Sequence, residues 1–144
     1  MYELRTAAEN DYEAIYSLNK TNMKAMVAQT WGEWNEEFQK DFFDKKFTPE
    51  RYRIIEVDKF FAGFIVFLEE KERVYIEEIQ LAPQFQGKGV GTQILHDIIT
   101  GAEKNKTPID LQVLKINTRA IALYNRLNFI LVGETDTHVL MRLV

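Results

Sequence analysis

Three glycines stand at alternate positions immediately before an apolar helical pattern, in the stretch QFQGKGVGTQIL. They are Gly87, Gly89 and Gly91. The first turn of a helix carries unpaired N–H groups and a partial positive charge. Glycines just before that turn let a ligand approach the backbone, and a phosphate suits such a site. The stretch therefore predicts a phosphate-binding loop at the start of a helix.

Two common phosphate-binding motifs do not fit this stretch. A Walker A loop needs a lysine between its last glycine and the following serine or threonine, but Thr92 follows Gly91 directly. A dinucleotide fingerprint needs G-x-G-x-x-G, and here the third glycine comes one residue early. The pattern that remains is Q-x-x-G-x-G, which Gln86, Gly89 and Gly91 satisfy.

Two neighbouring carboxylates, Glu77 and Glu78, precede the glycines in a stretch with strand character. Successive side chains of a strand point to opposite faces, so one glutamate can face a reacting group while the other faces elsewhere. Tyr75 shares the face of Glu77. The chain has two histidines, His96 and His138, and no cysteine. A transition-metal site therefore has no ligand set at a recognisable spacing, and we expect no metal.

The rest of the chain predicts the elements that position these groups. Apolar runs and alternation predict strands, and apolar residues at intervals of three and four predict helices. Pro83 cannot donate to a sheet, so the strand before it ends there. The predicted strands are 2–7, 51–57, 60–70, 73–82, 109–117, 130–135 and 138–144. The predicted helices are about 10–22 with Asn10 or Asp11 as its cap, one or two pieces within 23–47 that break near Gly32, 90–102 and 118–129. This order predicts a mixed α/β fold, with a mainly antiparallel central sheet, flanking helices and one strand–helix–strand crossover.

Composition excludes several classes of protein. The 144 residues, of which 46% are hydrophobic and 28% charged, fit one domain with a real core. The net charge of −4 disfavours nucleic acid, and no apolar run reaches the length of a membrane span. The acidic N-terminus lacks the pattern of a secretory signal, and the absence of cysteine suits a reducing compartment. We therefore expect a cytoplasmic protein that binds neither nucleic acid nor membranes.

The glycine motif and its flanks resemble the GNAT superfamily of N-acetyltransferases. The stretch IEEIQLAPQFQGKGVGTQIL looks like the strand, loop and helix of this family that bind acetyl-coenzyme A. About 25 residues later, LKINTRAIALYNRLNF is similar to its second signature, N-x-x-A-x-x-L-Y-x-x-x-G-F. The matching residues are Asn117, Ala120, Leu123, Tyr124 and Phe129. Asn128 stands where the family usually has glycine, and asparagine tolerates a left-handed backbone well enough to end the helix there.

The resemblance implies that residues 1–144 form a single N-acetyltransferase domain. It implies transfer of an acetyl group from acetyl-coenzyme A directly to a primary amine, between two central strands that splay apart. Tyr124 would protonate the leaving sulfur, Asn117 would hold the pantetheine arm, and an N–H near Leu81 or Ala82 would polarise the acetyl carbonyl. The expected cofactor-binding residues are Leu81, Ala82, Gln86, Gly87, Lys88, Gly89, Val90, Gly91, Thr92, Asn117 and Tyr124.

The resemblance leaves more than one candidate for the base and for the acceptor. Glu77 is the first candidate for the base and Glu78 the second, and a water could relay the proton. The acceptor is a small-molecule or peptide amine, and a homodimer is expected from the resemblance alone. The expected acceptor-binding residues are Met23, Trp31, Trp34, Tyr75, Glu77 and His138. Aromatic residues of the region around Gly32, Phe38 among them, can instead pack the helices on the sheet. Two alternatives stay open: a non-catalytic acyl-coenzyme A sensor or interaction module, and a nucleotide-phosphate protein of another kind.

Overall fold

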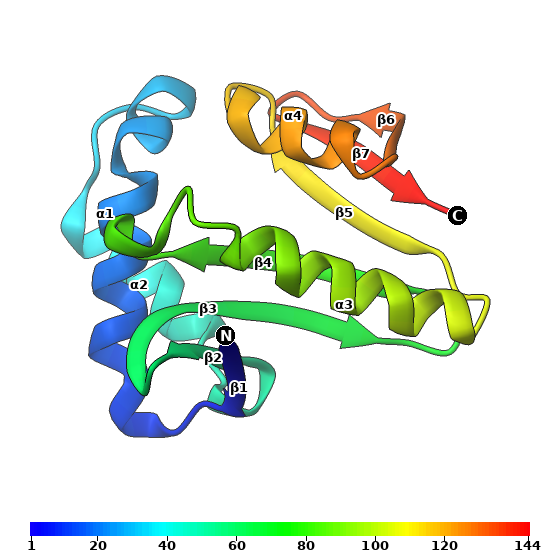
Figure 1. Cartoon of the computed structure of the whole chain (residues 1–144). Coiled ribbons are helices and arrows are strands. Elements are labelled where there is room, and N and C mark those ends of the chain that lie inside the picture. The colour runs from blue at the N-terminus through cyan, green and yellow to red at the C-terminus, as the bar shows by residue number, and fades with distance from the viewer. The chain divides into compact units, whose positions relative to one another are not determined.

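The computed structural model describes all 144 residues and has the predicted α/β architecture (Figure 1). Its sheet has seven strands in the order β1-β2-β3-β4-β5-β7-β6. The strands are β1 (Tyr2–Thr6), β2 (Arg53–Val57), β3 (Phe60–Glu69), β4 (Val74–Leu81), β5 (Ile109–Leu114), β6 (Ile130–Glu134) and β7 (His138–Leu143). The helices are α1 (Tyr12–Thr30), α2 (Glu36–Lys46), α3 (Val90–Lys104) and α4 (Thr118–Arg126). Because β4 and β5 are parallel and joined by α3, the predicted crossover is confirmed. No helix combines the length and the apolar character that crossing a membrane requires.

The chain divides into two compact units, each built from two separate segments. Unit 1 consists of Met1–Val66 and Glu78–Gly91, and unit 2 consists of Phe67–Glu77 and Thr92–Val144. One boundary therefore falls between the neighbouring residues Glu77 and Glu78, and another between Gly91 and Thr92.

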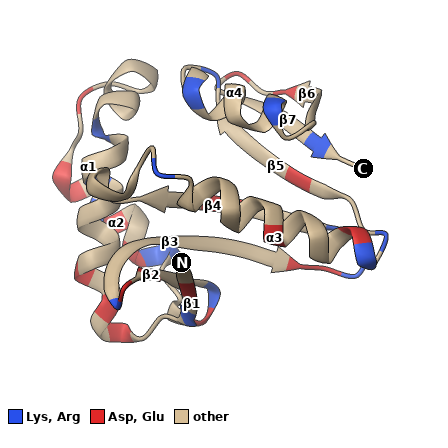
Figure 2. Cartoon of the chain, in the orientation of Figure 1, with Lys and Arg blue, Asp and Glu red and all other residues tan.

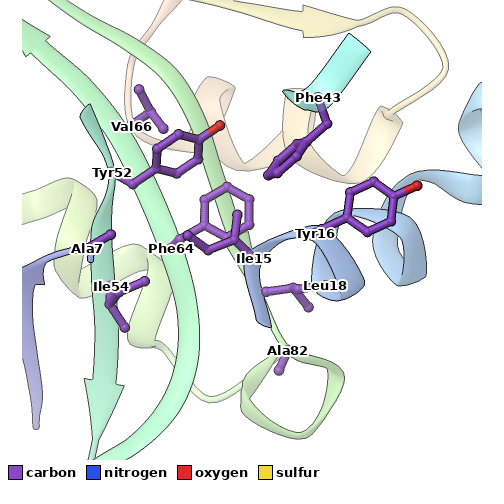
Figure 3. Packing of buried hydrophobic residues seen from close by; sticks show 10 residues of the cluster. All are labelled: Ala7, Ile15, Tyr16, Leu18, Phe43, Tyr52, Ile54, Phe64, Val66 and Ala82. Carbon is purple, nitrogen blue, oxygen red and sulfur yellow. The ribbon is translucent and has the colours of Figure 1, made fainter. Parts of the chain in front are cut away.

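Unit 1 has an apolar core between α1 and the antiparallel strands β1, β2 and β3. Figure 3 shows side chains of α1, β2 and β3 pointing into one cluster. Ile15, Ile54 and Phe64 are completely buried, and burying each of them stabilises the fold by about 1.5–3 kcal/mol. Ala82 belongs to the same cluster. The core therefore fixes the end of β4, which leads into the glycine loop.

The start of α1 differs from the prediction. Asp11 stands at the N-cap position, but its carboxylate makes no capping hydrogen bond to the helix. It accepts instead from the N–H of Ala8 at 2.8 Å and from both terminal nitrogens of Arg5, each at 2.9 Å. Asp11 therefore occupies a predicted cap position but does not cap the helix with its side chain, because a charged partner on β1 competes for the same carboxylate. Asn10 lies in the short 3-10 turn before the helix.

The helical region after residue 22 was only partly predicted. α1 does not end near residue 22 but continues to Thr30, because no glycine or proline interrupts residues 23–30. The break near Gly32 is confirmed: its φ is +118° and its N–H donates to the carbonyl of Val27. α2 then begins after Asn35, whose side chain accepts the N–H of Phe38 at 2.8 Å.

Unit 2 has its own apolar core, to which α3, α4 and the sheet contribute. β4 pairs with β5 from Val74–Ile109 to Ile76–Leu111, and β5 pairs antiparallel with β7. On α3, Ile94, Leu95 and Ala102 are buried. One cluster of buried residues in unit 2 consists of Val74, Ile76, Leu95, Ala102, Ile109, Leu111, Val113, Tyr124, Phe129 and Met141.

The end of α4 confirms the prediction for Asn128, whose φ is +72°. Its N–H donates to the carbonyl of Asn125, and the N–H of Phe129 donates to the carbonyl of Tyr124, both at 3.0 Å. These two bonds form a Schellman motif, which normally has glycine at the left-handed position. The turn places Phe129 against Tyr124, with ring centroids 5.5 Å apart.

Candidate active site

Two of the three glycines of the loop have a left-handed backbone. Gly87 and Gly89 have φ of +73° and +84°, a region that favours glycine. A Cβ added at either residue would meet nothing within 4 Å, so open space lies beside the backbone. α3 begins directly afterwards, at Val90. The arrangement fits a phosphate at a helix start.

The backbone at Gly91 does not require a glycine. Its φ lies outside the left-handed region, and a Cβ there would come to 3.6 Å from Cδ1 of Leu81. That distance is ordinary contact, so backbone geometry does not require a glycine at this position. Lys88 is exposed and is the only charged residue between Leu81 and Asp97. Figure 2 shows this one basic segment in the coil that leads into α3.

Gln86 was predicted to bind the cofactor, but its amide is engaged within the protein. Its Nε2 donates to the carbonyl oxygen of Leu81 at 2.8 Å. Asn22 of α1 donates to the same oxygen at 3.0 Å. Gln86 therefore ties the loop to the end of β4, which gives a physical reason for the glutamine in Q-x-x-G-x-G. This positioning contact uses Nε2, and the expected contact of Gln86 with the cofactor stays a prediction.

Of the two N–H groups predicted to polarise the acetyl carbonyl, one is engaged in the sheet. The N–H of Ala82 donates to the carbonyl of Ala62 on β3 at 2.8 Å, so the prediction for Ala82 is wrong. Leu81 remains the candidate whose N–H would polarise the acetyl carbonyl. The backbones of β3 and β4 approach each other closely beside it, as a Cβ added to Gly63 shows: it would come to 2.0 Å from the carbonyl oxygen of Gln80.

A chain of side-chain amides, which the sequence patterns did not predict, connects α1 to β4 within unit 1. Gln80 is buried, and its Nε2 donates to Oδ1 of Asn19 at 2.9 Å and to Oε1 of Glu78 at 3.0 Å. Asn22 donates to Oε1 of Gln80 at 3.3 Å. A glutamine among the alternating apolar residues of β4 was the one available signal. Glu78 and Gln80 thus share the β4 face that meets α1.

Glu77 and Tyr75 belong to the part of β4 in unit 2. Tyr75 is half-buried and pairs with Asp110 of β5. The guanidinium of Arg73 lies 4.7 Å from the centre of its ring. Burial is the main cause that raises the pKa of the Tyr75 phenol, and the charge of Glu77 adds to it. Tyr75 is therefore a neutral phenol near pH 7.

Tyr124 and Asn117 both lie in the α4 segment of unit 2. Tyr124 is 6% exposed, and burial raises the pKa of its phenol to about 12. A phenol with this pKa is protonated across the physiological range and can donate. Asn117 is the N-cap of α4, where its Oδ1 accepts the N–H of Ala120 at 3.2 Å. Its side-chain oxygen thus serves the helix start, and its expected contact with pantetheine stays a prediction.

The residues predicted for the acceptor differ in their surroundings. Trp31 is 60% exposed. Trp34 packs against the core of unit 1, and its Nε1 donates to Glu36 at 2.8 Å. Met23 is half-buried. Packing on the sheet, the alternative interpretation of these residues, is wrong for Trp31 and for Phe38, which is also exposed.

The two histidines have separate surroundings. His96 is exposed on α3. His138 is half-buried at the start of β7, with Nδ1 at 2.8 Å from Oγ1 of Thr137, and burial lowers its pKa. No group of three or more histidine, aspartate or glutamate side chains lies close enough to hold a metal ion.

The two units hold different parts of the predicted site. Unit 1 holds the base candidate Glu78, the glycine loop as far as Gly91, and the acceptor candidates of the helical region. Unit 2 holds the base candidate Glu77, the start of α3 from Thr92, the acid candidate Tyr124 and three more candidates, Tyr75, Asn117 and His138.

The fold is that of an α/β protein with a glycine turn and open space at the start of α3. The family model of the acetyltransferase (GNAT) family matches residues 9–129. The chain therefore belongs to this family.

Solved structures share the fold. PaiA N-acetyltransferase from Thermoplasma acidophilum, in complex with coenzyme A, has a TM-score of 0.78 at 16% identity, over 99% of this chain and 98% of that one. Arabidopsis thaliana Naa50, in complex with the bisubstrate analogue CoA-Ac-MVNAL, has a TM-score of 0.67 at 18% identity, over 99% and 98%. The ribosomal-protein-S18-alanine N-acetyltransferase from Escherichia coli has a TM-score of 0.66 at 23% identity, over 99% and 93%. A sequence comparison with curated proteins found no significant match.

Proposed function

We propose that this chain transfers an acetyl group from acetyl-coenzyme A directly to a primary amine. The observation that carries the proposal is the glycine turn, with two left-handed glycines and open space at the start of α3, in a member of the GNAT family. Two proteins of the same fold are described with coenzyme A or a coenzyme A-containing analogue. The residues present fit the pyrophosphate, because N–H groups of the turn are the donors that such a group needs.

The acetyl donor would supply an activated thioester. The loop from Gly87 to Thr92 would hold its pyrophosphate, with Lys88 at the rim. The N–H of Leu81 would polarise the acetyl carbonyl, and Asn117 would orient the pantetheine arm. These contacts would align the two reactants, which contributes much of the acceleration in a two-substrate reaction.

The chemistry also needs a base and an acid. A carbon–nitrogen bond forms, the carbon–sulfur bond breaks, and the amine loses a proton while the departing sulfur gains one. We propose a carboxylate of β4, Glu77 or Glu78, as the base, and Tyr124 as the acid. The raised pKa of Tyr124 supports this role because the phenol keeps its proton until the sulfur requires it.

The acceptor is proposed as a class, a small-molecule or peptide amine. Of the three solved neighbours described above, one is named for a ribosomal protein and one holds a peptide-containing analogue. Trp31, exposed beside the break between α1 and α2, supports an acceptor contact in unit 1. Met23, Trp34, Tyr75 and His138 remain proposed acceptor contacts.

We also propose that residues 1–144 act as a single N-acetyltransferase domain in the cytoplasm, free of metal. The family model and the solved neighbours together extend over nearly the whole chain, which supports the domain assignment. Pairing of two copies is supported by three exposed apolar residues on β6, Ile130, Leu131 and Val132. Light scattering after gel filtration would give the mass in solution.

The test is a thiol-release assay with acetyl-coenzyme A and a panel of polyamines, amino acids, aminoglycosides and peptides. We expect release with one amine class and a sharp decrease in the Tyr124→Phe protein. Calorimetric titration with acetyl-coenzyme A runs in parallel. Binding without release on any amine would favour an acyl-coenzyme A sensor, and absence of binding would overturn the proposal.

A further inference from the structure

Gln80 is an unusual residue for the inner face of a strand. It is 7% exposed, and Asp11 is the other buried polar or charged residue in the core. Burying an amide costs free energy unless its donors and acceptor find partners. Here both sides of the amide are used: Nε2 contacts Asn19 and Glu78, and Oε1 contacts Asn22.

The orientation of this amide is fixed by the groups at the two ends of the chain of hydrogen bonds. At one end, Asn22 meets the carbonyl oxygen of Leu81, which can only accept, so the nitrogen of Asn22 must face it. The same nitrogen then meets Gln80, which must present its oxygen there. At the other end, Gln80 presents its nitrogen to the carboxylate of Glu78, which accepts. A flipped Gln80 would place oxygen against oxygen at Glu78.

The consequence is that one carboxylate oxygen of Glu78 is held at 3.0 Å by an amide that cannot turn away. Asn19 and Asn22 come from α1, so this helix determines where the carboxylate lies. A base that is held in place loses less freedom in the reaction than an exposed strand glutamate. Glu78 also lies in the same unit as Leu81 and the glycine loop, whereas Glu77 does not.

We infer that Glu78, and not Glu77, accepts the proton of the acceptor amine, and that Gln80 and Asn19 are its positioning residues. This inference rests on the proposed acetyltransferase function. Gln80 and Asn19 do not themselves touch the reacting atoms. They act only through the carboxylate of Glu78.

The test is a double-mutant cycle measured by thiol release. Glu78→Gln removes the base and is expected to lower kcat about 100-fold or more, the range for a general base. Gln80→Met keeps the shape of the side chain but removes its N–H groups. It is expected to lower kcat about tenfold, because a partial displacement of Glu78 costs less than the roughly 100-fold that a 1 Å misplacement can cost. KM for acetyl-coenzyme A is expected to stay unchanged in both proteins. In the Glu78→Gln protein, adding Gln80→Met is expected to have no further effect on kcat.

Three more proteins complete the experiment. Glu77→Gln tests the competing candidate, and its loss of kcat is expected to be smaller than that of Glu78→Gln, because its carboxylate is not held by Gln80. Glu69→Gln, at an exposed strand glutamate of β3 outside the proposed site, is the matched control, with kcat expected to stay within about twofold of wild type. Asn19→Ala removes a partner of Gln80 from a half-buried position on α1, so it tests the same effect if Gln80→Met does not fold. Its kcat is expected to decrease in the presence of Glu78 only.

The outcomes distinguish a failure of this inference from a failure of the proposed acetyltransferase function. An equal loss from Gln80→Met with and without Glu78 would show a purely structural role and overturn the inference. A larger loss from Glu77→Gln than from Glu78→Gln would overturn it as well. Wild-type protein that binds acetyl-coenzyme A but releases no thiol would instead overturn the proposed function, and the inference with it.

Discussion

The side-chain amide of Gln86 donates to the carbonyl oxygen of Leu81, closing the glycine loop back onto the strand that precedes it. The loop from Gly87 to Gly89 is exposed and therefore depends on this bond for a fixed entry into α3. The N–H of Leu81 is the proposed acetyl contact, and its carbonyl oxygen holds Gln86 at the start of the proposed pyrophosphate loop. Leu81 therefore supports both contacts.

Gln86→Met should weaken binding of coenzyme A, because the loop must then be ordered by the ligand itself. We expect an affinity about tenfold lower, equivalent to loss of about 1.4 kcal/mol, close to one hydrogen bond. Calorimetric titration measures the change. Gln93→Met is the matched control, since Gln93 is exposed on α3 and its amide contacts only a neighbouring turn at Asp97. Equal affinities for the two variants would contradict the role of Gln86.

Gly89→Ala should weaken binding of coenzyme A and also destabilise the fold, since a non-glycine residue at φ +84° costs about 1–2 kcal/mol. Gly101→Ala is the matched control, because Gly101 lies inside α3 and has open space around it. That change should stabilise the protein by about 0.5–1 kcal/mol and leave affinity unaltered. Urea unfolding and titration measure both effects. Gly89→Glu should bind more weakly still, and unchanged affinity in that protein would refute the phosphate loop.

Tyr124→Phe should lower kcat and leave the melting temperature nearly unchanged, because the ring and its contact with Phe129 remain. The pKa of the phenol is raised to about 12, so the proton is present at every lower pH. The rate should therefore show no alkaline decrease due to this residue up to about pH 10. Tyr52→Phe, at a second buried tyrosine in the core of unit 1, is the control and should keep full activity. An alkaline limb below pH 9 that disappears in Tyr124→Phe would contradict the raised pKa of this phenol, and an unchanged kcat in Tyr124→Phe would contradict its role as the acid.

Asp110 should carry part of the acid sensitivity of the fold. Its hydrogen bond with Arg142, and then that with Arg73, lowers the pKa of its carboxyl. Arg142 donates from Nε at 2.6 Å and from a terminal nitrogen at 3.0 Å, and Arg73 donates at 3.1 Å. Because the pKa in the folded state is depressed, this stabilisation is present above the unfolded pKa of about 4 and is lost as the pH falls through the folded value.

Asp110→Asn should therefore lower the melting temperature at pH 7 by several degrees, about 4 °C, and the difference from wild type should shrink between pH 5 and pH 2. Thermal unfolding followed by circular dichroism at several pH values measures both. A difference that stayed constant down to pH 2 would show that the carboxylate is not held as described.

Local chemistry determined which features could be predicted from the sequence. The glycine turn before a helix, the helix that follows it and the left-handed backbone at Asn128 depend on neighbours within a few residues, and the structure has all three. The carboxylate of Asp11 escaped prediction because its partner Arg5 comes from another element.

The same limit applies to the candidate site. Adjacent glutamates on a strand predict opposite faces but not which face meets a helix. That choice depends on Asn19 of α1 meeting Gln80 of β4, sixty-one residues apart, and no periodicity reports such a contact. For the same reason the sequence offered Ala82 as a donor, whereas pairing with Ala62 of β3 removes it.

The alternation of the two units along the chain has a consequence during synthesis. The polypeptide passes from one unit to the other after Val66, after Glu77 and after Gly91, so neither unit is a continuous stretch. A ribosome must deliver residue 91 before unit 1 is complete, and the last strand before unit 2 is complete. We therefore expect nascent chains that end before residue 91 to remain protease-sensitive. Two fragments produced by a single cut in the middle of the sequence should fold only when they are mixed.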